Sequence, residues 1–293
     1  MLPLGSIFRK YKLSFHCYAN DVQIYLPLNP SNNDSVQTLL DCFLEVKSWL
    51  AENFLHLNET KTEAILFGCN PSDFPANYLG PLIQNVLALV KNLGVTFDSN
   101  FKLDKQVNSV VKNSFFQLRT LSKVKGYLSR RDLETVIHAF INSRLDYCNS
   151  LYVGLDQNLL HRLQLVQNAA AHLLTGKCKR EHTTPVLAFL HWLPFSFRIN
   201  FKILLFVFKA LRGLAPGYLS KLLHIHASAR ALRSANQRLS VVLKTRLKSK
   251  GDRTFEAAAP RLWNSLPHYI RSAESIEVFK SSLKTHFFSL AFT

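Results

Sequence analysis

Short alternating runs of apolar and polar residues fill the first hundred positions of the chain, and longer helical periodicities follow them. Residues 14–28 place β-forming side chains on both sides of Ala19-Asn20-Asp21, and Asn and Asp tolerate the positive φ of a tight turn. This pattern predicts a strand, a turn and a second strand. Two further hairpins are predicted, one over residues 54–68 with its turn at 58–60 and one over 86–99 with its turn near Lys91-Asn92.

Apolar residues at helical spacing predict one helix in this first part. Asp34-Ser35 is the expected N-cap, and the helix should end near Asn53. Its predicted apolar face consists of Val36, Leu39, Leu40, Phe43, either Val46 or Lys47, and Leu50.

The second part predicts a bundle of four to five helices, because capping residues precede its apolar periodicities. The predicted helices of this bundle cover 101–121, a segment that begins at Ser129, 156–176 and 194–213. A last amphipathic helix is predicted to begin at Ser275, in the C-terminal part of the chain. The face expected to be buried after Ser129 consists of Leu133, Val136, Ile137, Phe140 and Ile141.

These elements predict an α+β chain with three parts. Residues 1–100 carry the hairpins and one helix, residues 101–222 form the helical bundle, and residues 223–293 form a small basic C-terminal module. Trp49, Trp192 and Trp263 have apolar neighbours, so we expect them to anchor the core.

The charge is divided unevenly between these parts. Residues 1–100 have a net charge of −3, whereas residues 101–293 have a net charge of +20. Such an excess indicates a polyanionic partner, and RNA or DNA bound through phosphates is the partner we expect. The candidate contacts are Arg246, Lys248, Lys250 and Arg253, although a basic loop of this kind can equally be a solvated surface segment.

Several other functional classes find little support in the sequence. The longest apolar run, residues 203–211, is too short to cross a membrane, and the first residues lack the order of a secretory signal. Five scattered cysteines without a C-x-x-C pair suit a reducing compartment, and His224 and His226 lack a third metal ligand nearby. No motif for a small-molecule cofactor is found, so we expect none.

A carboxylate at the tip of a hairpin is a plausible metal ligand, because the strands hold it rigidly while the turn exposes it. Asp21 is placed in this way. Taken alone, the Asn20-Asp21 pair is also explained by turn geometry.

Longer stretches of the chain resemble the reverse transcriptases of non-LTR (LINE-type) retrotransposons. PLGSIFRKYKLSFHCYANDVQIYLPL (residues 3–28) is similar to the segment around the Y-A-D-D box of that family. The other similar stretches, in the family's order, are KSWLAENFLHLNETKTEAILFG, KNLGVTFDS, HAFINSRLDYCNSLYVGL, LQLVQNAAAHLLTG, HWLPFSFRINFKIL and APRLWNSLP.

The resemblance implies a role for several residues. The family's box supplies carboxylates to two divalent ions, so Mg²⁺ is the expected cofactor and Asp21 its expected ligand. Asn20 stands where the family has its first aspartate, and an amide brings no negative charge to the metals. Lys61 resembles the lysine that supports the pyrophosphate, and Gly94 lies in a segment like the primer-grip hairpin. Without the resemblance, Lys61 is explained as a solvated lysine, and Gly94 is explained as a glycine that interrupts a strand.

The fold implied by the resemblance is an incomplete polymerase palm followed by a thumb-like helical bundle and the basic module. Only twenty residues precede Asp21, so we expect the fingers and the strand with the other catalytic aspartate to be missing. The expected function is therefore that of a reverse transcriptase remnant that is inactive as an isolated chain. A non-catalytic nucleic-acid-binding or scaffold protein and a translated product without function are the alternatives.

Overall fold

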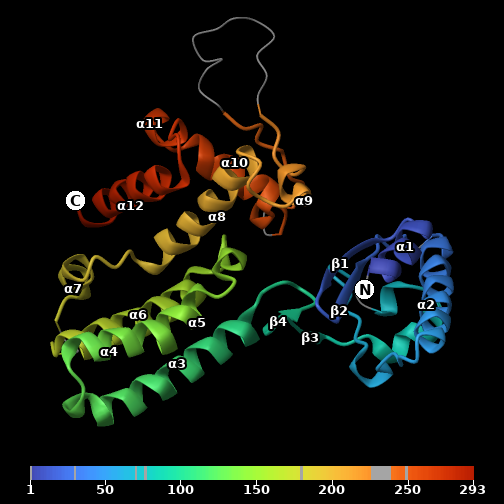
Figure 1. Cartoon of the computed structure of the whole chain (residues 1–293), viewed down its shortest axis with the longest axis horizontal. Helices are drawn as coiled ribbons and strands as arrows, with labels where there is room; N and C mark the ends of the chain where they lie inside the picture. Colours follow the sequence, from blue (N-terminus) through green and yellow to red (C-terminus); the bar gives the residue numbers. More distant parts are fainter. Residues whose placement is uncertain are drawn as a thin grey trace, which may run out of the picture. The chain divides into compact units, whose positions relative to one another are not determined.

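The computed structural model describes residues 2–29, 31–69, 71–75, 78–178, 181–225, 239–247 and 250–293. The chain divides into two compact units, Met1–Phe101 and Lys102–Thr293. The described residues form a mixed α+β structure that is mostly helical and contains two small antiparallel sheets (Figure 1). The α+β prediction is confirmed at this level.

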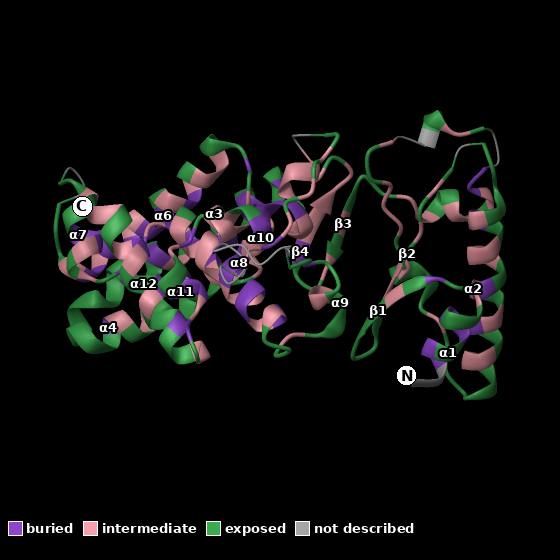
Figure 2. Cartoon of the chain, turned by 90° about the horizontal axis from the view of Figure 1, so that it is seen from above, coloured by how far each residue is buried: buried purple, intermediate pink, exposed green. Residues whose placement is uncertain are grey.

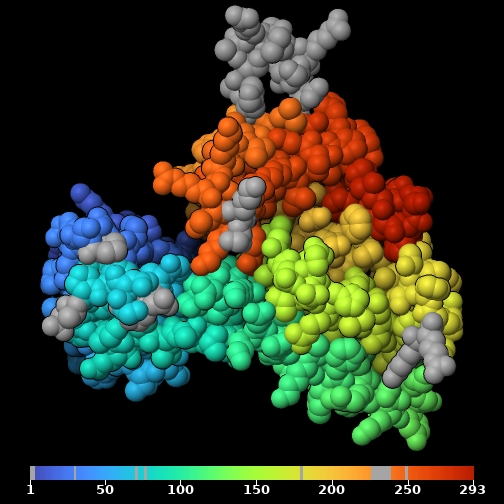
Figure 3. Space-filling view, turned by 180° about the vertical axis from the view of Figure 1, so that it is seen from behind, coloured from blue at the N-terminus to red at the C-terminus, as the bar shows by residue number. Residues whose placement is uncertain are grey.

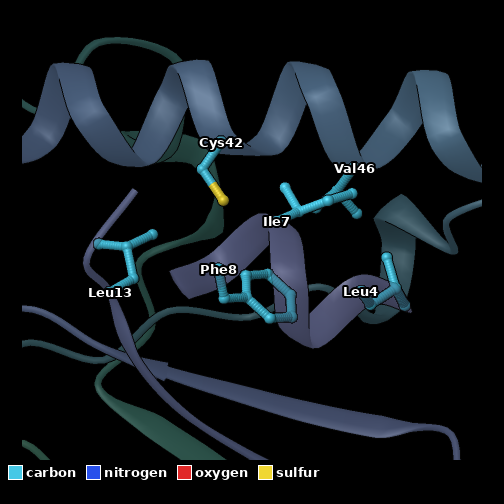
Figure 4. Close-up of a cluster of buried hydrophobic side chains, with 6 residues drawn as sticks. All are labelled: Leu4, Ile7, Phe8, Leu13, Cys42 and Val46. Atoms are coloured by element: carbon cyan, nitrogen blue, oxygen red, sulfur yellow. The ribbon is translucent and has the colours of Figure 1, made fainter. Parts of the chain in front are cut away.

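The first unit begins with a helix, α1 (Leu2–Lys10), that the sequence analysis does not predict. It packs against α2 (Asp34–Glu52), and the apolar side chains of the two helices point toward one another (Figure 4). The buried cluster consists of Leu4, Ile7, Phe8, Leu13, Cys42 and Val46. Burial raises the pKa of the Cys42 thiol to about 11, because the apolar surroundings disfavour the thiolate.

A polar contact joins the same two helices at the surface. The Glu45 carboxylate of α2 accepts hydrogen bonds from Lys10 Nζ at 2.6 Å and from the Tyr11 hydroxyl at 2.8 Å. These donors stabilise the ionised form, so they hold the pKa of Glu45 below its ordinary value. The same contact raises the pKa of Lys10 and of Tyr11.

Helix α2 confirms the predicted helix and its end, because its C-cap is Asn53. The predicted N-cap is wrong: the helix begins at Asp34, so its N-cap is Asn33, whose side chain makes no capping hydrogen bond. The most buried residues are Val36, Cys42 and Val46, so the buried face is centred slightly differently from the predicted one.

The first predicted hairpin is confirmed. Strands β1 (Ser14–Tyr18) and β2 (Asp21–Tyr25) are antiparallel, and Tyr18 pairs with Asp21 across the turn Ala19-Asn20. Phe15 of β1 lies against Phe8 of α1, with 4.9 Å between the ring centroids, so the hairpin is anchored to the helical cluster.

The second predicted hairpin, over residues 54–68, is wrong. Its predicted turn is the short helix η1 (Glu59–Lys61), whose N-cap Asn58 accepts a hydrogen bond from the Lys61 amide. The backbone beyond it does not return to residues 54–57, because Ala64 bonds instead to Asn85 and Leu87. The connecting segment contains two more short helices, η2 (Pro71–Asp73) and η3 (Gly80–Asn85).

The third predicted hairpin is confirmed, but its turn lies two residues later than predicted. Strands β3 (Leu89–Asn92) and β4 (Val95–Asp98) are antiparallel and turn at Leu93-Gly94. Lys91 and Asn92 therefore belong to β3.

The second unit is mainly helical in its described part. Its long helices are α3 (Asp104–Val124), α6 (Gln157–Thr175), α8 (Phe195–Leu211) and α12 (Ile276–Phe292). The shorter elements are η4 (Lys125–Tyr127), α4 (Arg130–Ile137), η5 (His138–Asn142), α5 (Ser143–Asp146), η6 (Asn149–Tyr152), α7 (Thr183–Phe189), α9 (Gly217–Ser220), η8 (Gly251–Arg253), α10 (Phe255–Asn264) and α11 (His268–Arg271).

Three of the predicted helix starts are confirmed by capping contacts. Ser129, Asp156 and Ser275 each accept a hydrogen bond from a backbone amide in the first turn of the following helix. The segment after Ser129 departs from a regular helix, because η5 is a π-helical turn. This turn leaves Phe140 at the surface, 46% exposed, where the sequence pattern places it in the core.

Helix α8 is the centre of the second unit. It packs against α6, α10 and α12, and Figure 2 shows buried residues gathered around it. Phe208 of α8 stacks on Phe279 of α12 with ring centroids 4.3 Å apart, and Trp263 of α10 lies beside Phe279. Trp263 is only 1% exposed, and Trp192 is also buried, so the prediction of core anchors is confirmed for both. Trp49 is partly buried against the α1–α2 cluster.

Residues 223–293, predicted as a separate module, belong to the same compact unit as residues 102–222. Helices α10 and α12 supply its large apolar side chains to the core around α8. In the described part of the chain, no helix has the length and apolar character that a membrane crossing requires.

Candidate functional site

The hairpin β1–β2 places Asn20 and Asp21 at its tip. Both residues are exposed, and Ala19 beside them has a φ of 52°. A left-handed backbone at a residue with a Cβ costs about 1 kcal/mol, so this turn is held in a strained conformation by the strand pairing on each side. The register pairs Tyr18 with Asp21, which places Asp21 at the start of β2, directly after the turn.

The residues at this tip do not form a complete site for Mg²⁺. Such an ion is held in octahedral geometry by oxygen ligands, of which two carboxylates are typical in nucleotide transfer. Among the described residues, no group of three or more His, Cys, Asp or Glu side chains is arranged to hold a metal. Asp21 therefore stands as a single carboxylate beside the neutral amide of Asn20.

Lys61 lies at the end of η1, in a tight turn that Asn58 closes. The Asn58 side chain accepts hydrogen bonds from the Lys61 amide at 3.1 Å and from the Thr60 hydroxyl at 2.8 Å. The Lys61 side chain is exposed, and within the described residues it takes part in no ion pair. The neighbouring Glu59 is paired with Lys47 at 2.7 Å, and this contact lowers the pKa of the Glu59 carboxyl.

Gly94 is the second residue of the β3–β4 turn. Leu93 has a φ of 45° and Gly94 a φ of 81°, and positive φ at both central residues defines a type I′ turn. The glycine is therefore needed for the backbone of the hairpin itself.

The two hairpins are joined by a side-chain hydrogen bond. Gln23 Nε2 of β2 donates to Asn92 Oδ1 of β3 at 2.7 Å. The structure thus brings the hairpin that bears Asp21 next to the hairpin that bears Gly94. No ion pair or hydrogen bond connects Lys61 to either hairpin tip among the contacts of the described residues.

The four predicted basic contacts near the C-terminus have different environments. Arg246 is exposed and Lys250 is half-buried, whereas Lys248 lies outside the described residues. The Arg253 side chain lies against Gly154, and its Nε donates to the Val153 carbonyl at 3.1 Å. A Cβ at position 154 would approach Arg253 Cγ to 2.7 Å, so Arg253 is fitted to this glycine and ties η8 to the segment before α6.

Helix α3 carries a basic surface that the sequence analysis does not single out. Lys105, Lys112, Arg119 and Lys123 are exposed, and their spacing of seven, seven and four residues places them on one face of the helix. We call these four residues the α3 basic stripe. Phe116, which is 57% exposed, lies on the same face.

The opposite face of α3 packs against α6. Its buried residues include Val107, Ser114, Leu118 and Leu121. Figure 3 shows α3, in green, at the surface of the second unit. Within the described residues, no member of the α3 basic stripe forms an ion pair, so its charges face solvent. The sequence contains the signal for this stripe, because these basic residues recur at helical spacing on the side of the helix opposite its apolar residues.

The polar residues of the HAFINSRLDYCNSLYVGL stretch form an internal network. Arg198 of α8 donates through Nε to Asp146 Oδ1 at 3.0 Å and also pairs with Asp146 Oδ2 through Nη2. Asn142 lies within 3.5 Å of Arg198 Nη1, and its amide is 2.8 Å from His138 Nδ1. These contacts join the π-helical turn to α8, so they account for several polar residues in this stretch without a binding role.

Comparisons of this chain with models of protein families, with curated proteins and with solved structures found no match to any of them.

Proposed function

We propose that this chain is a reverse transcriptase remnant of a non-LTR retrotransposon that binds nucleic acid through phosphates and does not polymerise. The α3 basic stripe is the observation that carries the binding part of this proposal. The ordered resemblance from the box at residues 18–21 to APRLWNSLP supports the descent from that family.

The loss of polymerase activity follows from the chemistry of the hairpin tip. Nucleotide transfer requires carboxylates that hold two metal ions against the primer and the leaving pyrophosphate. Asp21 is accompanied by the neutral amide of Asn20, and no group of three or more His, Cys, Asp or Glu side chains among the described residues is arranged to hold a metal. A single carboxylate cannot balance the charge of two divalent ions at this position.

Primer extension with Mg²⁺ or Mn²⁺ tests this part. We expect no template-directed incorporation above that of an Asp21→Ala variant. Incorporation that depends on Asp21 would overturn the proposal that the chain is inactive.

Phosphate binding follows from the geometry of the stripe. From Lys105 to Lys123 the helix rises by about 27 Å, the length of roughly eight base-pair steps of a duplex. Four cations along this distance can contact successive phosphates on one side of a nucleic acid. The exposed Phe116 ring between them adds an apolar surface for sugars or bases.

The binding test compares two variants that lose the same charge. One replaces Lys105, Lys112, Arg119 and Lys123 by Gln, and the matched control replaces the exposed Lys221, Lys244, Lys280 and Lys284 by Gln. Fluorescence anisotropy with RNA, DNA and heteroduplex at several salt concentrations gives the slope of log affinity against log salt. We expect the stripe variant to flatten this slope by about three, since each neutralised phosphate contributes roughly 0.7 to 0.9.

Equal effects of the two variants would show that only net charge matters and would contradict a defined interface. A third variant, Arg246→Ala with Lys250→Ala, measures the contribution of the C-terminal basic segment. A large loss of affinity there, with none from the stripe, would move the interface to residues 246–250.

A further inference from the structure

Two exposed aromatic rings lie near the end of the second unit where α3 passes into α4. Tyr127, the last residue of η4, is 90% exposed, and Phe189, the last residue of α7, is 64% exposed. Rings with this exposure contribute little to the apolar core. The stability of the fold therefore does not explain why Tyr127 and Phe189 are aromatic.

An arginine three residues after Tyr127 contacts the second ring. The Arg130 guanidinium, at the start of α4, lies over the Phe189 ring at 5.4 Å from its centroid. The end of α7 and the start of α4 are therefore neighbours, as Figure 1 also shows. We call Tyr127, Arg130 and Phe189 the aromatic tip.

The surroundings of the aromatic tip are strongly basic. Lys123, Lys125 and Arg131 are exposed and are neighbours of Tyr127 and Arg130 along the chain. The nearest acid along the chain, Asp132, accepts a hydrogen bond from the Ser129 hydroxyl at 2.6 Å and belongs to the capping arrangement of α4. The local field is thus positive where the two rings are exposed.

We propose that the aromatic tip is a stacking platform for the unpaired bases of single-stranded nucleic acid. This inference rests on the proposed function, because the strand would be held by phosphates on the α3 basic stripe, whose last member, Lys123, is four residues from Tyr127. Exposed rings interleaved with cations suit single strands, since every base offers a π face and every nucleotide a phosphate. The guanidinium over Phe189 offers a further planar surface for stacking.

A duplex fits this surface less well than a single strand does. Paired bases already stack on one another, so the rings reach them only where pairing ends. The tip should therefore add affinity for single strands, or for strands that extend beyond a duplex, and little for a blunt duplex.

The test uses the full chain and three variants. Tyr127→Ala with Phe189→Ala removes both rings, Tyr127→Leu with Phe189→Leu keeps apolar volume without a π face, and Tyr269→Ala is the control at a similarly exposed tyrosine of α11. The probes are a single-stranded oligonucleotide that contains 2-aminopurine and a blunt duplex of the same length. Circular dichroism checks that each variant retains its helices.

We expect both double variants to bind the single strand about tenfold more weakly and to lose the fluorescence change that stacking of 2-aminopurine produces. Duplex affinity and the salt slope should match those of the unaltered chain, because no charge is removed. The Tyr269→Ala control should behave like the unaltered chain.

Three outcomes overturn the inference. In the first, the ring variants bind the single strand normally while the α3 basic stripe variant loses binding. That result would exclude a stacking role for the aromatic tip and leave the proposed function intact. Loss of binding to anionic vesicles in the ring variants, without an effect on oligonucleotides, would assign the rings to a lipid surface. Failure of the unaltered chain to bind any nucleic acid would overturn both proposals.

Discussion

The Gln23 side chain donates a hydrogen bond to Asn92 Oδ1 at 2.7 Å, and this contact joins two hairpins that are separated by about seventy residues of sequence. Tyr25 donates to the Gln23 Oε1 at 2.6 Å, so the Gln23 amide is held from both ends. The relative placement of the β1–β2 and β3–β4 hairpins thus depends partly on one amide pair at their surface.

Removal of either amide should loosen the two hairpins together. We expect Gln23→Ala and Asn92→Ala each to reduce the free energy of opening of the hairpins by about 1 kcal/mol, and the double variant to cost little more than one of them. Hydrogen exchange of peptides that cover residues 14–25 and 89–98 measures this free energy. Additive losses in the double variant would show that the two side chains act independently.

The type I′ turn at Leu93-Gly94 gives a second prediction. Leu93 occupies a left-handed conformation that Asn adopts more readily, so Leu93→Asn should stabilise the hairpin by about 0.5–1 kcal/mol. Gly94→Ala should destabilise it by about 1–2 kcal/mol, because it places a Cβ at a φ of 81°. Hydrogen exchange over residues 89–98 measures both changes, and an unchanged Gly94→Ala variant would contradict the turn assignment.

The contact of Glu45 with Lys10 and Tyr11 makes the first unit sensitive to acid. The pKa of Glu45 is lowered in the folded chain, so its stabilisation is present above the unfolded pKa of about 4.3 and is lost as the pH falls through the lower folded value. The pKa values of Lys10 and Tyr11 are raised in the folded chain, so the stabilisation from these two groups is present at lower pH. It is lost at alkaline pH, as the pH rises above about 10.

Glu45→Gln should therefore flatten the acid limb of the stability profile of the first unit. Proteolysis of α1 as a function of pH is a suitable measurement, since this helix depends on the contact with α2. Glu63→Gln is the matched control, because Glu63 is exposed and forms no ion pair within the described residues. An acid limb that responds equally to both substitutions would contradict the role of the Glu45 contact.

Features fixed by local chemistry are the ones the sequence predicts well. The helix starts at Ser129, Asp156 and Ser275 depend on hydrogen bonds to amides two or three residues away, so the signal and the structure occupy the same short segment. The β1–β2 hairpin is equally local, because its strands are adjacent and its turn has two residues.

Features that depend on distant partners are not predicted. Ala64 forms its backbone bonds with Asn85 and Leu87 instead of closing a hairpin with residues 54–57, and nothing within residues 54–68 specifies that choice. Helix α1 is stabilised by α2, which begins only at Asp34, so the nine residues of α1 give a weak signal by themselves.

The candidate nucleic-acid interface shows a different limit of prediction from the sequence. Arg253 belongs to the densest basic segment of the sequence, yet its side chain is fitted against Gly154. The α3 basic stripe has fewer charges per residue, but the helix aligns Lys105, Lys112 and Arg119 on its exposed face. Charge periodicity is therefore a better guide than charge density to which basic side chains share an exposed helix face.

The ion pair between Arg198 and Asp146 should be the most asymmetric contact of the second unit. The Arg198 side chain is 16% exposed, whereas that of Asp146 is 42% exposed. Without its partner, Asp146 can be solvated by water, but Arg198 would keep a largely buried charge. We expect Asp146→Ala to destabilise the unit by about 2–3 kcal/mol and Arg198→Met, which retains the apolar stem, by about 1–2 kcal/mol. Replacement of both residues should cost less than Asp146→Ala alone, because it removes the unpaired cation.

Urea unfolding followed by the helical signal at 222 nm measures these values. Lys177→Ala is the control for an exposed pair, with an expected loss below about 0.5 kcal/mol. Equal losses for Asp146→Ala and Lys177→Ala would show that the Arg198 contact is only a surface pair.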